Sequence, residues 1–169
     1  MDKEAKKNVL RSIMKLDFNS QGFLVPNINI VTNLECFKAT FVDELLISKT
    51  RVNLYENYLN YSNELKHLLQ VDYLTQWING SFVTKTINPK DIDLVTFIPE
   101  PIFSKKEKEI IDFKQRNWFD LKVDAYLIIE RSNFGFESDK LYWLNQFSKT
   151  RKISRKGIRN DKGFIEISY

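Results

Sequence analysis

Residues 77–97 of the chain, WINGSFVTKTINPKDIDLVTF, contain the ends of two segments with the pattern of β-strands and the connection between them. The β-branched and aromatic run VDYLTQWI at 71–78 predicts a strand that enters a tight turn at Asn79–Gly80. DIDLVTFI at 91–98 alternates acidic with apolar side chains before it meets prolines, which predicts a second strand.

Asp91 and Asp93 lie two residues apart in the second of these strands. Because side chains alternate across a strand, both carboxylates project from one face, while Ile92 and Leu94 project from the other. Phosphoryl and nucleotidyl transfer use two divalent cations about 3.5–4 Å apart, and hard cations of this kind prefer carboxylate oxygens. The acid pair can bind such ions without bending the backbone. Taken alone, the same pattern also fits a solvated strand edge with a turn-forming aspartate.

A third acid lies in the apolar segment LKVDAYLIIE at 121–130, which predicts another strand. Asp124 stands there between Val123 and Ala125, where an unpaired buried carboxylate would cost several kcal/mol. Its position therefore indicates a metal ion or a cationic partner. An ordinary ion pair with Lys122 or Arg131 is the alternative.

The turn Asn79-Gly80-Ser81 follows the first strand, and nine residues separate Ser81 from Asp91. Glycine allows close backbone approach, and a serine hydroxyl with the neighbouring amides can hold the phosphates of a nucleotide. The pair Gly-Ser is a weak signal when it is taken alone.

These residues together resemble the nucleotidyltransferase-fold family of the DNA polymerase β superfamily: Gly-Ser, a spacer near ten residues, acid-apolar-acid in a hydrophobic strand, and a third acid in VDAYL. The segment is most similar to a little-characterised prokaryotic branch of small proteins, resembling the minimal nucleotidyltransferases of toxin-antitoxin or defence systems. That branch shares the wording GSF-T-K…-DIDL and some later positions, here Trp143, Phe147, Lys156, Gly157 and Ile158. The resemblance covers roughly residues 23–169 and is most specific at 79–97.

The resemblance implies a metal-dependent transfer of a nucleoside monophosphate from an NTP to a hydroxyl group. The acceptor could be a protein, an RNA end or a small molecule. Two Mg²⁺ or Mn²⁺ ions would be held by the three acids, which are also the implied catalytic residues: Asp91, Asp93 and Asp124. Phosphate binding would fall to residues of the Gly-Ser turn and to nearby basic side chains: Gly80, Ser81, Lys85, Lys90 and Lys156, with Arg155 as a further candidate.

Several helices are predicted around these strands. Residues 2–15 have an amphipathic pattern, and 34–70 contain neither Gly nor Pro and predict one long helix or two consecutive ones. A capping box at Ser104 predicts a helix through about Trp118. A shorter helix is predicted at 139–149, with a core face made of Leu141, Trp143, Leu144 and Phe147.

The order of the elements predicts an α/β (α+β) fold. Residues 18–34 predict an extended loop with one short strand, and 163–168 predict a final strand. We expect a mixed sheet of about four strands with helices mainly on one face, which the resemblance identifies as a nucleotidyltransferase fold. An N-terminal helical extension at 1–20 would precede a single domain at 21–169.

The composition fits a folded cytoplasmic protein with no membrane partner, because no run of about 18 apolar residues is present. Cys36 is the only cysteine and His67 the only histidine, so one chain cannot form a disulfide or a Cys/His zinc site. We expect Cys36 to be a small buried apolar residue and His67 to lie at the surface.

The net charge of +4 is unevenly distributed. The segment 149–163 carries seven basic side chains against Asp161 alone, whereas the remainder, apart from a basic N-terminus, is mildly acidic. This balance favours contact with nucleotides or nucleic acid, although a solvated basic segment is equally compatible with it. Two other functions therefore stay open: a nucleic-acid-binding protein that uses this segment, and a catalytically weak or inactive partner of a cognate protein in a toxin-antitoxin or phage-defence system.

Overall fold

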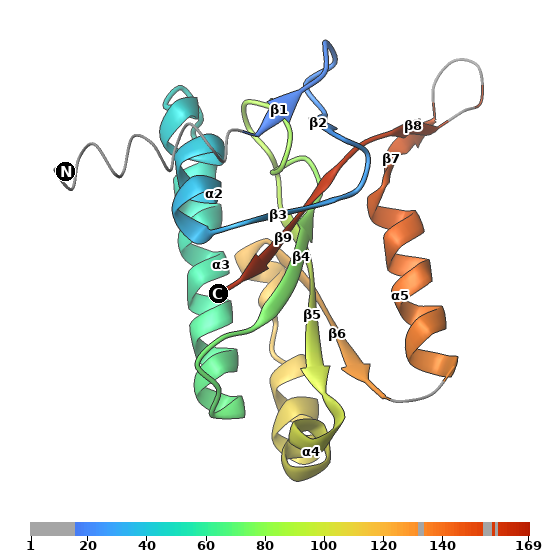
Figure 1. Cartoon of the computed structure of the whole chain (residues 1–169). Helices are drawn as coiled ribbons and strands as arrows, with labels where there is room; N and C mark the ends of the chain where they lie inside the picture. Colours follow the sequence, from blue (N-terminus) through green and yellow to red (C-terminus); the bar gives the residue numbers. More distant parts are fainter. Residues whose placement is uncertain (1–15, 132–133, 154–156, 158) are drawn as a thin grey trace, which may run out of the picture.

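The computed structural model describes residues 16–131, 134–153, 157 and 159–169. A mixed five-stranded sheet forms the centre of the molecule, with strand order β3-β9-β4-β5-β6 (Figure 1). Its strands are β3 (Asn29–Thr32), β9 (Phe164–Ser168), β4 (Thr75–Asn79), β5 (Ile92–Pro99) and β6 (Val123–Glu130). The β3–β9 and β5–β6 pairs are parallel, whereas β4 is antiparallel to both of its neighbours. The predicted mixed sheet is confirmed, with one more strand than expected.

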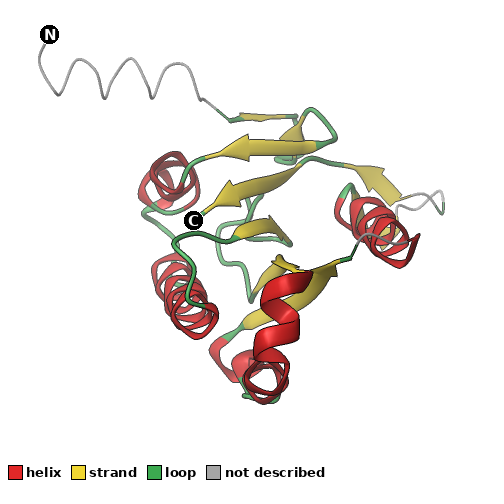
Figure 2. Cartoon of the chain, turned by 60° about the horizontal axis from the view of Figure 1, so that its bottom comes forward, coloured by secondary structure: helices red, strands yellow, loops and turns green. Residues whose placement is uncertain are grey.

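Helices lie on both sides of this sheet (Figure 2). They are α2 (Leu34–Phe41), α3 (Arg51–Leu69), α4 (Glu100–Lys114) and α5 (Phe134–Phe147). The first three pack over one face and share the larger hydrophobic core with Ile92 and Leu94 of β5. Helix α5 packs over the opposite face, where Phe147 contacts a smaller core around Val95 and Phe97. The expectation of helices mainly on one face therefore holds for three of these four.

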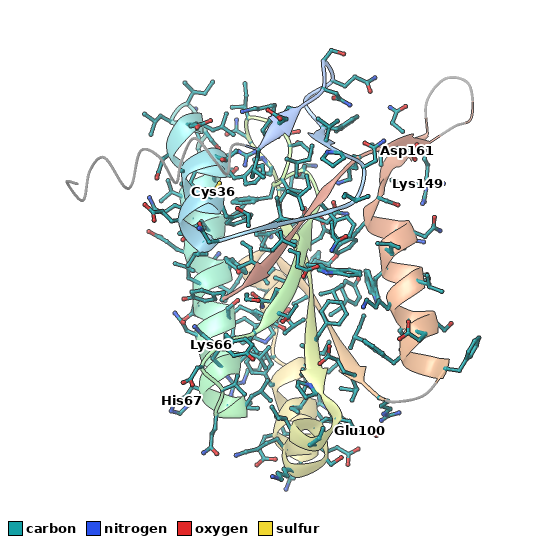
Figure 3. All side chains as sticks on the ribbon, viewed as in Figure 1. Cys36, Lys66, His67, Glu100, Lys149 and Asp161 are labelled. Carbon is teal, nitrogen blue, oxygen red and sulfur yellow. The ribbon has the colours of Figure 1, made fainter. Side chains whose placement is uncertain are left out.

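The segment 34–70 forms two helices, which resolves the alternatives that its pattern left open. The side chain of Asn33 caps the first by accepting a hydrogen bond from the Cys36 amide at 2.8 Å. A short 3-10 helix, η1 (Asp43–Leu45), separates α2 from α3. Cys36 is half-buried against the larger core, and His67 is exposed on α3 (Figure 3).

A buried polar network fixes α3 on the sheet. Gln76 of β4 accepts a hydrogen bond from the Tyr58 hydroxyl at 2.9 Å and donates to Thr96 Oγ1 of β5 at 3.0 Å. It also exchanges hydrogen bonds with Ser62 of α3. All four side chains are buried, so the network satisfies polar groups that would otherwise be costly inside the core.

The predicted capping box at Ser104 is wrong. Helix α4 begins one turn earlier, at Glu100, with Pro99 as its N-cap and Pro101 in its first turn. Proline at the start of a helix costs no hydrogen bond and presets the backbone angle, so these prolines begin α4 rather than merely ending β5. The Ser104 hydroxyl instead donates to the Glu100 carbonyl oxygen at 3.0 Å inside the helix. Trp118 lies in a separate 3-10 helix, η2 (Trp118–Leu121).

Helix α5 also differs from its prediction, because it begins at Phe134 rather than at 139. Trp143 and Phe147 pack against the smaller core as expected. Leu141 and Leu144, however, are 63% and 37% exposed. The α5 side chains that pack against the smaller core are aromatic. The predicted core face is therefore confirmed for Trp143 and Phe147 and wrong for Leu141 and Leu144.

Two small hairpins were not predicted. Strands β1 (Asp17–Phe18) and β2 (Leu24–Val25) form one, and β7 (Lys149–Ile153) and β8 (Arg159–Asp161) form the other within the basic segment. Lys149 and Asp161 are paired across the second hairpin (Figure 3). The amphipathic helix predicted at 2–15 lies outside the described residues. Within the described ranges, no helix is long and apolar enough to cross a membrane.

Candidate active site

Three polar residues form one row across three neighbouring strands of the sheet. Asn79 of β4 is directly opposite Asp93 of β5, and Asp93 is directly opposite Asp124 of β6. Opposite residues on paired strands project from the same face, so all three side chains share one side of the sheet. The two predicted strand aspartates therefore come together although 31 positions separate them in the chain.

This row lies on the face of the sheet that α5 covers. Two positions along β4 and β5 from the row, Trp77 and Val95 belong to the smaller core under α5. Asp91 directly precedes β5, and strand alternation predicts the same face for it. The strand register thus places Asp93 and Asp124 on one face, and the position of Asp91 beside them stays a prediction.

The three acids differ in exposure. Asp93 is only 8% exposed, whereas Asp91 and Asp124 are half-buried. A buried carboxylate is stable only with hydrogen bonds or a compensating charge. Asp93 is therefore the acid for which the surrounding residues matter most. Arg131, one alternative partner considered for Asp124, instead pairs with Glu100 at 3.7 Å.

Gly80 packs directly against Asp93. Its φ of +79° lies in the region that favours glycine, and a Cβ at this position would be 1.9 Å from Asp93 Oδ2. The sequence predicts close approach of a phosphate at this glycine, but the neighbour in the structure is the carboxylate. The following turn is closed by Thr84, whose hydroxyl donates to the Ser81 carbonyl oxygen at 2.8 Å.

A buried arginine holds the loop that continues from this turn. The Arg51 guanidinium at the start of α3 donates five hydrogen bonds of 2.6–3.2 Å to the carbonyl oxygens of Phe41, Phe82, Thr84 and Thr86. Burial lowers the pKa of Arg51 to about 10. Because three of its four carbonyl partners belong to residues 82–86, Arg51 fixes the course of the chain that follows Gly80–Ser81.

Two of the basic residues predicted to bind phosphate, Lys85 and Lys90, are among the described residues. Lys85 Nζ lies 4.2 Å from the centre of the Phe18 ring, and Lys90 is exposed just before Asp91. Lys156 and Arg155 lie outside the described residues.

Sequence reasoning missed Lys162 as a member of the site. Its side chain is only 4% exposed, and its Nζ donates a hydrogen bond to Asn79 Oδ1 and lies 3.4 Å from the Gly80 carbonyl oxygen. The Lys162 amide donates to the Ser148 carbonyl oxygen at 2.8 Å, which fixes its backbone beside the end of α5. In the sequence Lys162 is one of seven basic residues in a run, and no local signal separates it from the others.

The donor set suits a hard cation. Asp91, Asp93 and Asp124 offer only oxygen ligands, which Mg²⁺ and Mn²⁺ prefer. Asp93 and Asp124 are on adjacent strands, and Asp91 is two residues from Asp93 in the sequence. Among the residues that the structure describes, however, no three His, Cys, Asp or Glu side chains are grouped closely enough to hold an ion. The fit therefore rests on ligand chemistry and backbone register.

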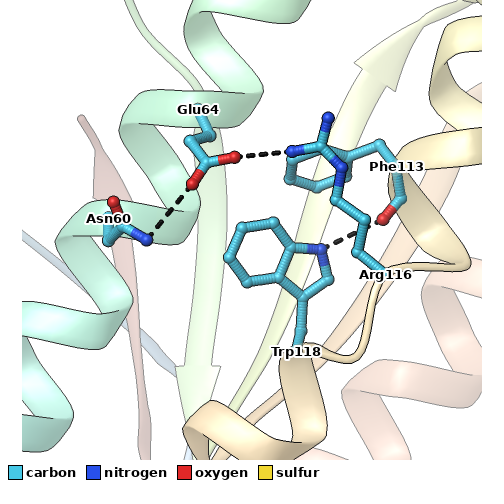
Figure 4. Close-up of polar contacts among 5 residues, drawn as sticks. All are labelled: Asn60, Glu64, Phe113, Arg116 and Trp118. Carbon is cyan, nitrogen blue, oxygen red and sulfur yellow. Dashed lines mark hydrogen bonds and ion pairs between the residues drawn. The ribbon is translucent and has the colours of Figure 1, made fainter.

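Two cavities lie near these elements. One of about 680 Å³ lies between α3 and α4, with Glu64 and Arg116 in its lining paired at 2.6 Å (Figure 4). Because α3 and α4 cover the other face of the sheet, this cavity is not part of the acid row. A smaller cavity of about 170 Å³ has Asp124 in its lining, but Tyr61 of α3, Phe113 of α4 and Trp118, which also line it, belong to the larger core. Most of the lining of both cavities therefore lies on the side of the sheet that α3 and α4 cover, away from the face that carries the row.

Comparison with known proteins gives one result. The model of a family of unknown function, DUF6932, matches residues 16–168, which is nearly the whole described chain. No curated protein and no solved structure matches the chain significantly. The matched range includes the whole row, the Gly80 turn and Lys162. The chain therefore belongs to the DUF6932 family.

Proposed function

We propose that this protein is a metal-dependent nucleotidyltransferase that moves a nucleoside monophosphate from an NTP to a hydroxyl group of an acceptor. The observation that carries the proposal is the register of Asp93 and Asp124 on adjacent parallel strands, with Gly80 against Asp93. Two acids at one edge of a sheet, beside a glycine turn, form a site in which phosphate and hard cations can meet.

The proposed reaction forms one phosphorus–oxygen bond and breaks another. The acceptor hydroxyl oxygen attacks the α-phosphorus of the NTP, and the bond between the α-phosphorus and its bridging oxygen breaks. The electron pair of that bond leaves with pyrophosphate. Asp124 takes the hydroxyl proton, because it is half-buried at the outer end of the row, on the edge strand β6.

The metal ions would be held by Asp91 and Asp93, with Asp124 completing the site. Bound Mg²⁺ or Mn²⁺ would neutralise phosphate charge and align the attacking and leaving oxygens. Gly80 and Ser81 would contact the β- and γ-phosphates through the turn. Arg51 takes no part in these contacts, but it holds the loop in place through its carbonyl partners.

The course of the basic segment supports a polyanionic acceptor such as an RNA end. Hairpin β7–β8 leaves the end of α5 at Ser148 and returns at Lys162, where the two backbones are joined by a hydrogen bond of 2.8 Å. The hairpin therefore begins and ends beside the row. An RNA acceptor predicts binding that weakens steeply with salt, because Lys and Arg contacts to phosphate release counterions.

The test is transfer of α-labelled NTPs in the presence of Mg²⁺ or Mn²⁺, with cell lysate and RNA as sources of acceptor. Asp93→Asn and Asp124→Asn keep the size of the side chain and should abolish labelling. Asp112→Asn is the matched control, since Asp112 is exposed on α4 at the other face of the sheet. Labelling that survives in both site variants, or wild-type protein that neither binds nor transfers any NTP, contradicts the proposal. NTP binding without transfer would favour an inactive member of the same fold.

A further inference from the structure

We propose that the buried ammonium of Lys162 is a phosphate-binding group of the Gly80–Ser81 turn, and that it recognises the polyphosphate part of a nucleotide. This inference rests on the proposed function for the identity of the ligand. Its physical basis is the hydrogen bonding of the Lys162 ammonium to Asn79, which belongs to the row, and to the carbonyl oxygen of Gly80 in the turn.

The contacts of Lys162 place its charge at the turn. Nζ donates a hydrogen bond to Asn79 Oδ1 and lies 3.4 Å from the Gly80 carbonyl oxygen. Gly80 in turn packs against Asp93 Oδ2. The ammonium therefore contacts the turn at Asn79 and Gly80, and the Asp93 carboxylate also packs against Gly80, so a phosphate bound at Gly80–Ser81 would meet the ammonium at short range.

Lys162 lies at a place where a charge needs compensation, because removing an ammonium from water costs several kcal/mol unless neighbouring groups offset that cost. Lys162 is only 4% exposed and leads into the apolar strand β9. A charge that is held in a low-dielectric place next to a half-buried turn interacts strongly with an incoming anion.

Other basic side chains near the turn are less suited to this role. The Lys85 ammonium lies over the Phe18 ring, and Lys90 is exposed to solvent. A charged ammonium donor favours anionic phosphate oxygens over a neutral base or a ribose. The ligand class is therefore a polyphosphate, and inorganic tripolyphosphate is the simplest probe of it.

The first experiment measures tripolyphosphate binding in Mg²⁺ by calorimetry. Lys162→Met should weaken binding by roughly tenfold or more, the effect of losing a hydrogen bond from a charged donor. Lys162→Arg should retain most of the affinity because it keeps the charge. Arg159→Met is the matched control: Arg159 is an exposed cation in β8 only three positions away, and its loss should change affinity by less than about twofold.

The second experiment does not require a folded Lys162→Met variant. In wild-type protein with ¹⁵N-labelled lysine, the Nζ resonance of Lys162 is identified by its absence from Lys162→Arg. Tripolyphosphate should shift this resonance more than it shifts those of exposed lysines. An unshifted Nζ resonance, or equal affinity in wild type and a folded Lys162→Met, overturns the inference.

The results also separate this inference from the proposed function. NTP transfer with unchanged tripolyphosphate binding in Lys162→Met would leave the function standing and remove the role of Lys162. Lys162-dependent tripolyphosphate binding without transfer to any acceptor would keep the role of Lys162 and contradict the proposed transfer activity. Wild-type protein that does not bind tripolyphosphate at all overturns the inference, and the transfer assay then judges the function by itself.

Discussion

Asp93 Oδ2 lies within 1.9 Å of the point where a Cβ on Gly80 would stand. The space next to this glycine is thus filled by the carboxylate of the central acid in the row. Any side chain at position 80 must displace Asp93, so glycine is required here by its neighbour as well as by its backbone angle.

Substitution Gly80→Ala should therefore disturb both stability and the site. The positive φ alone costs about 1–2 kcal/mol for a residue with a Cβ, and the overlap with Asp93 adds to that. We expect a lower urea midpoint and loss of Mn²⁺ binding. Gly157→Ala is the control, because Gly157 has a similar φ of +77° but no atom within 4 Å of the added Cβ. Equal losses in the two variants would contradict a specific role for the Gly80–Asp93 contact.

Replacement of Arg51 by lysine should destabilise the protein strongly. Lysine has three donors on one nitrogen and cannot reproduce five hydrogen bonds to four separated carbonyl groups. We expect a loss of about 3 kcal/mol or more in the free energy of unfolding, measured by urea titration.

Arg116→Lys provides the comparison for Arg51. Arg116 forms an exposed ion pair with Glu64 (Figure 4), and such pairs contribute about 1 kcal/mol or less. An effect of Arg51→Lys as small as that of Arg116→Lys would show that the loop after Gly80 does not depend on the buried guanidinium.

Stability should decline at alkaline pH. Burial is the main reason that the pKa of Tyr55 is raised to about 12, and burial raises the pKa values of Tyr58 and Tyr61 further above their usual range. The folded state keeps protons that unfolded tyrosines lose near pH 10, so stability falls as the pH rises from about 10 towards and beyond 12. The lowered pKa of Arg51 has the opposite effect and favours a rise in stability with pH, but it is one group against three tyrosines.

Urea midpoints measured between about pH 9 and pH 11 would test this prediction. Tyr58→Phe removes one of the three raised pKa values and should make the decline shallower, although it also removes the hydrogen bond to Gln76. A wild-type midpoint that stays constant or rises over this range would show that the buried tyrosines do not control alkaline stability.

Divalent metal should raise the melting temperature. A ligand that binds only the folded state stabilises it by about 2.7 kcal/mol at 100 times its dissociation constant. For a chain of 169 residues this corresponds to a shift of roughly 5–10 °C. Thermal unfolding with and without Mn²⁺ should show the shift in wild type and in Asp112→Asn, but not in Asp93→Asn. A shift that persists in Asp93→Asn would place the metal elsewhere.

The strands of the row could be predicted because their patterns are local. Asp91-Ile-Asp93 alternates strictly, and Asp124 is a single acid in an apolar run, so both strands and their acids were found from the sequence. The capping pattern at Ser104 predicts a helix start there, but the prolines at 99 and 101 signal a helix start as well. The helix follows the proline signal, which comes earlier in the chain, and this is why the start of α4 is predicted too late.

The basic side of the site could not be predicted in the same way. Lys162 reaches Asn79 because β9 pairs beside β4, and nothing in the residues around Lys162 specifies that pairing. Lys85 is only five residues from Gly80, yet its ammonium lies over Phe18. Nearness in sequence was therefore a poor guide to which cation joins the row, because the sheet order decides it.

The position of β9 between β3 and β4 has a consequence for the timing of folding during synthesis. The ribosome releases β3 and β4 long before residues 164–168 emerge. These two strands therefore cannot join one sheet until β9 is available to pair between them. The Asn79 side chain likewise receives its hydrogen bond from Lys162 only after 83 more residues have been synthesised. A nascent chain can thus bring Asp93 and Asp124 together early, but it receives the cation beside Gly80 only when translation reaches its last strand.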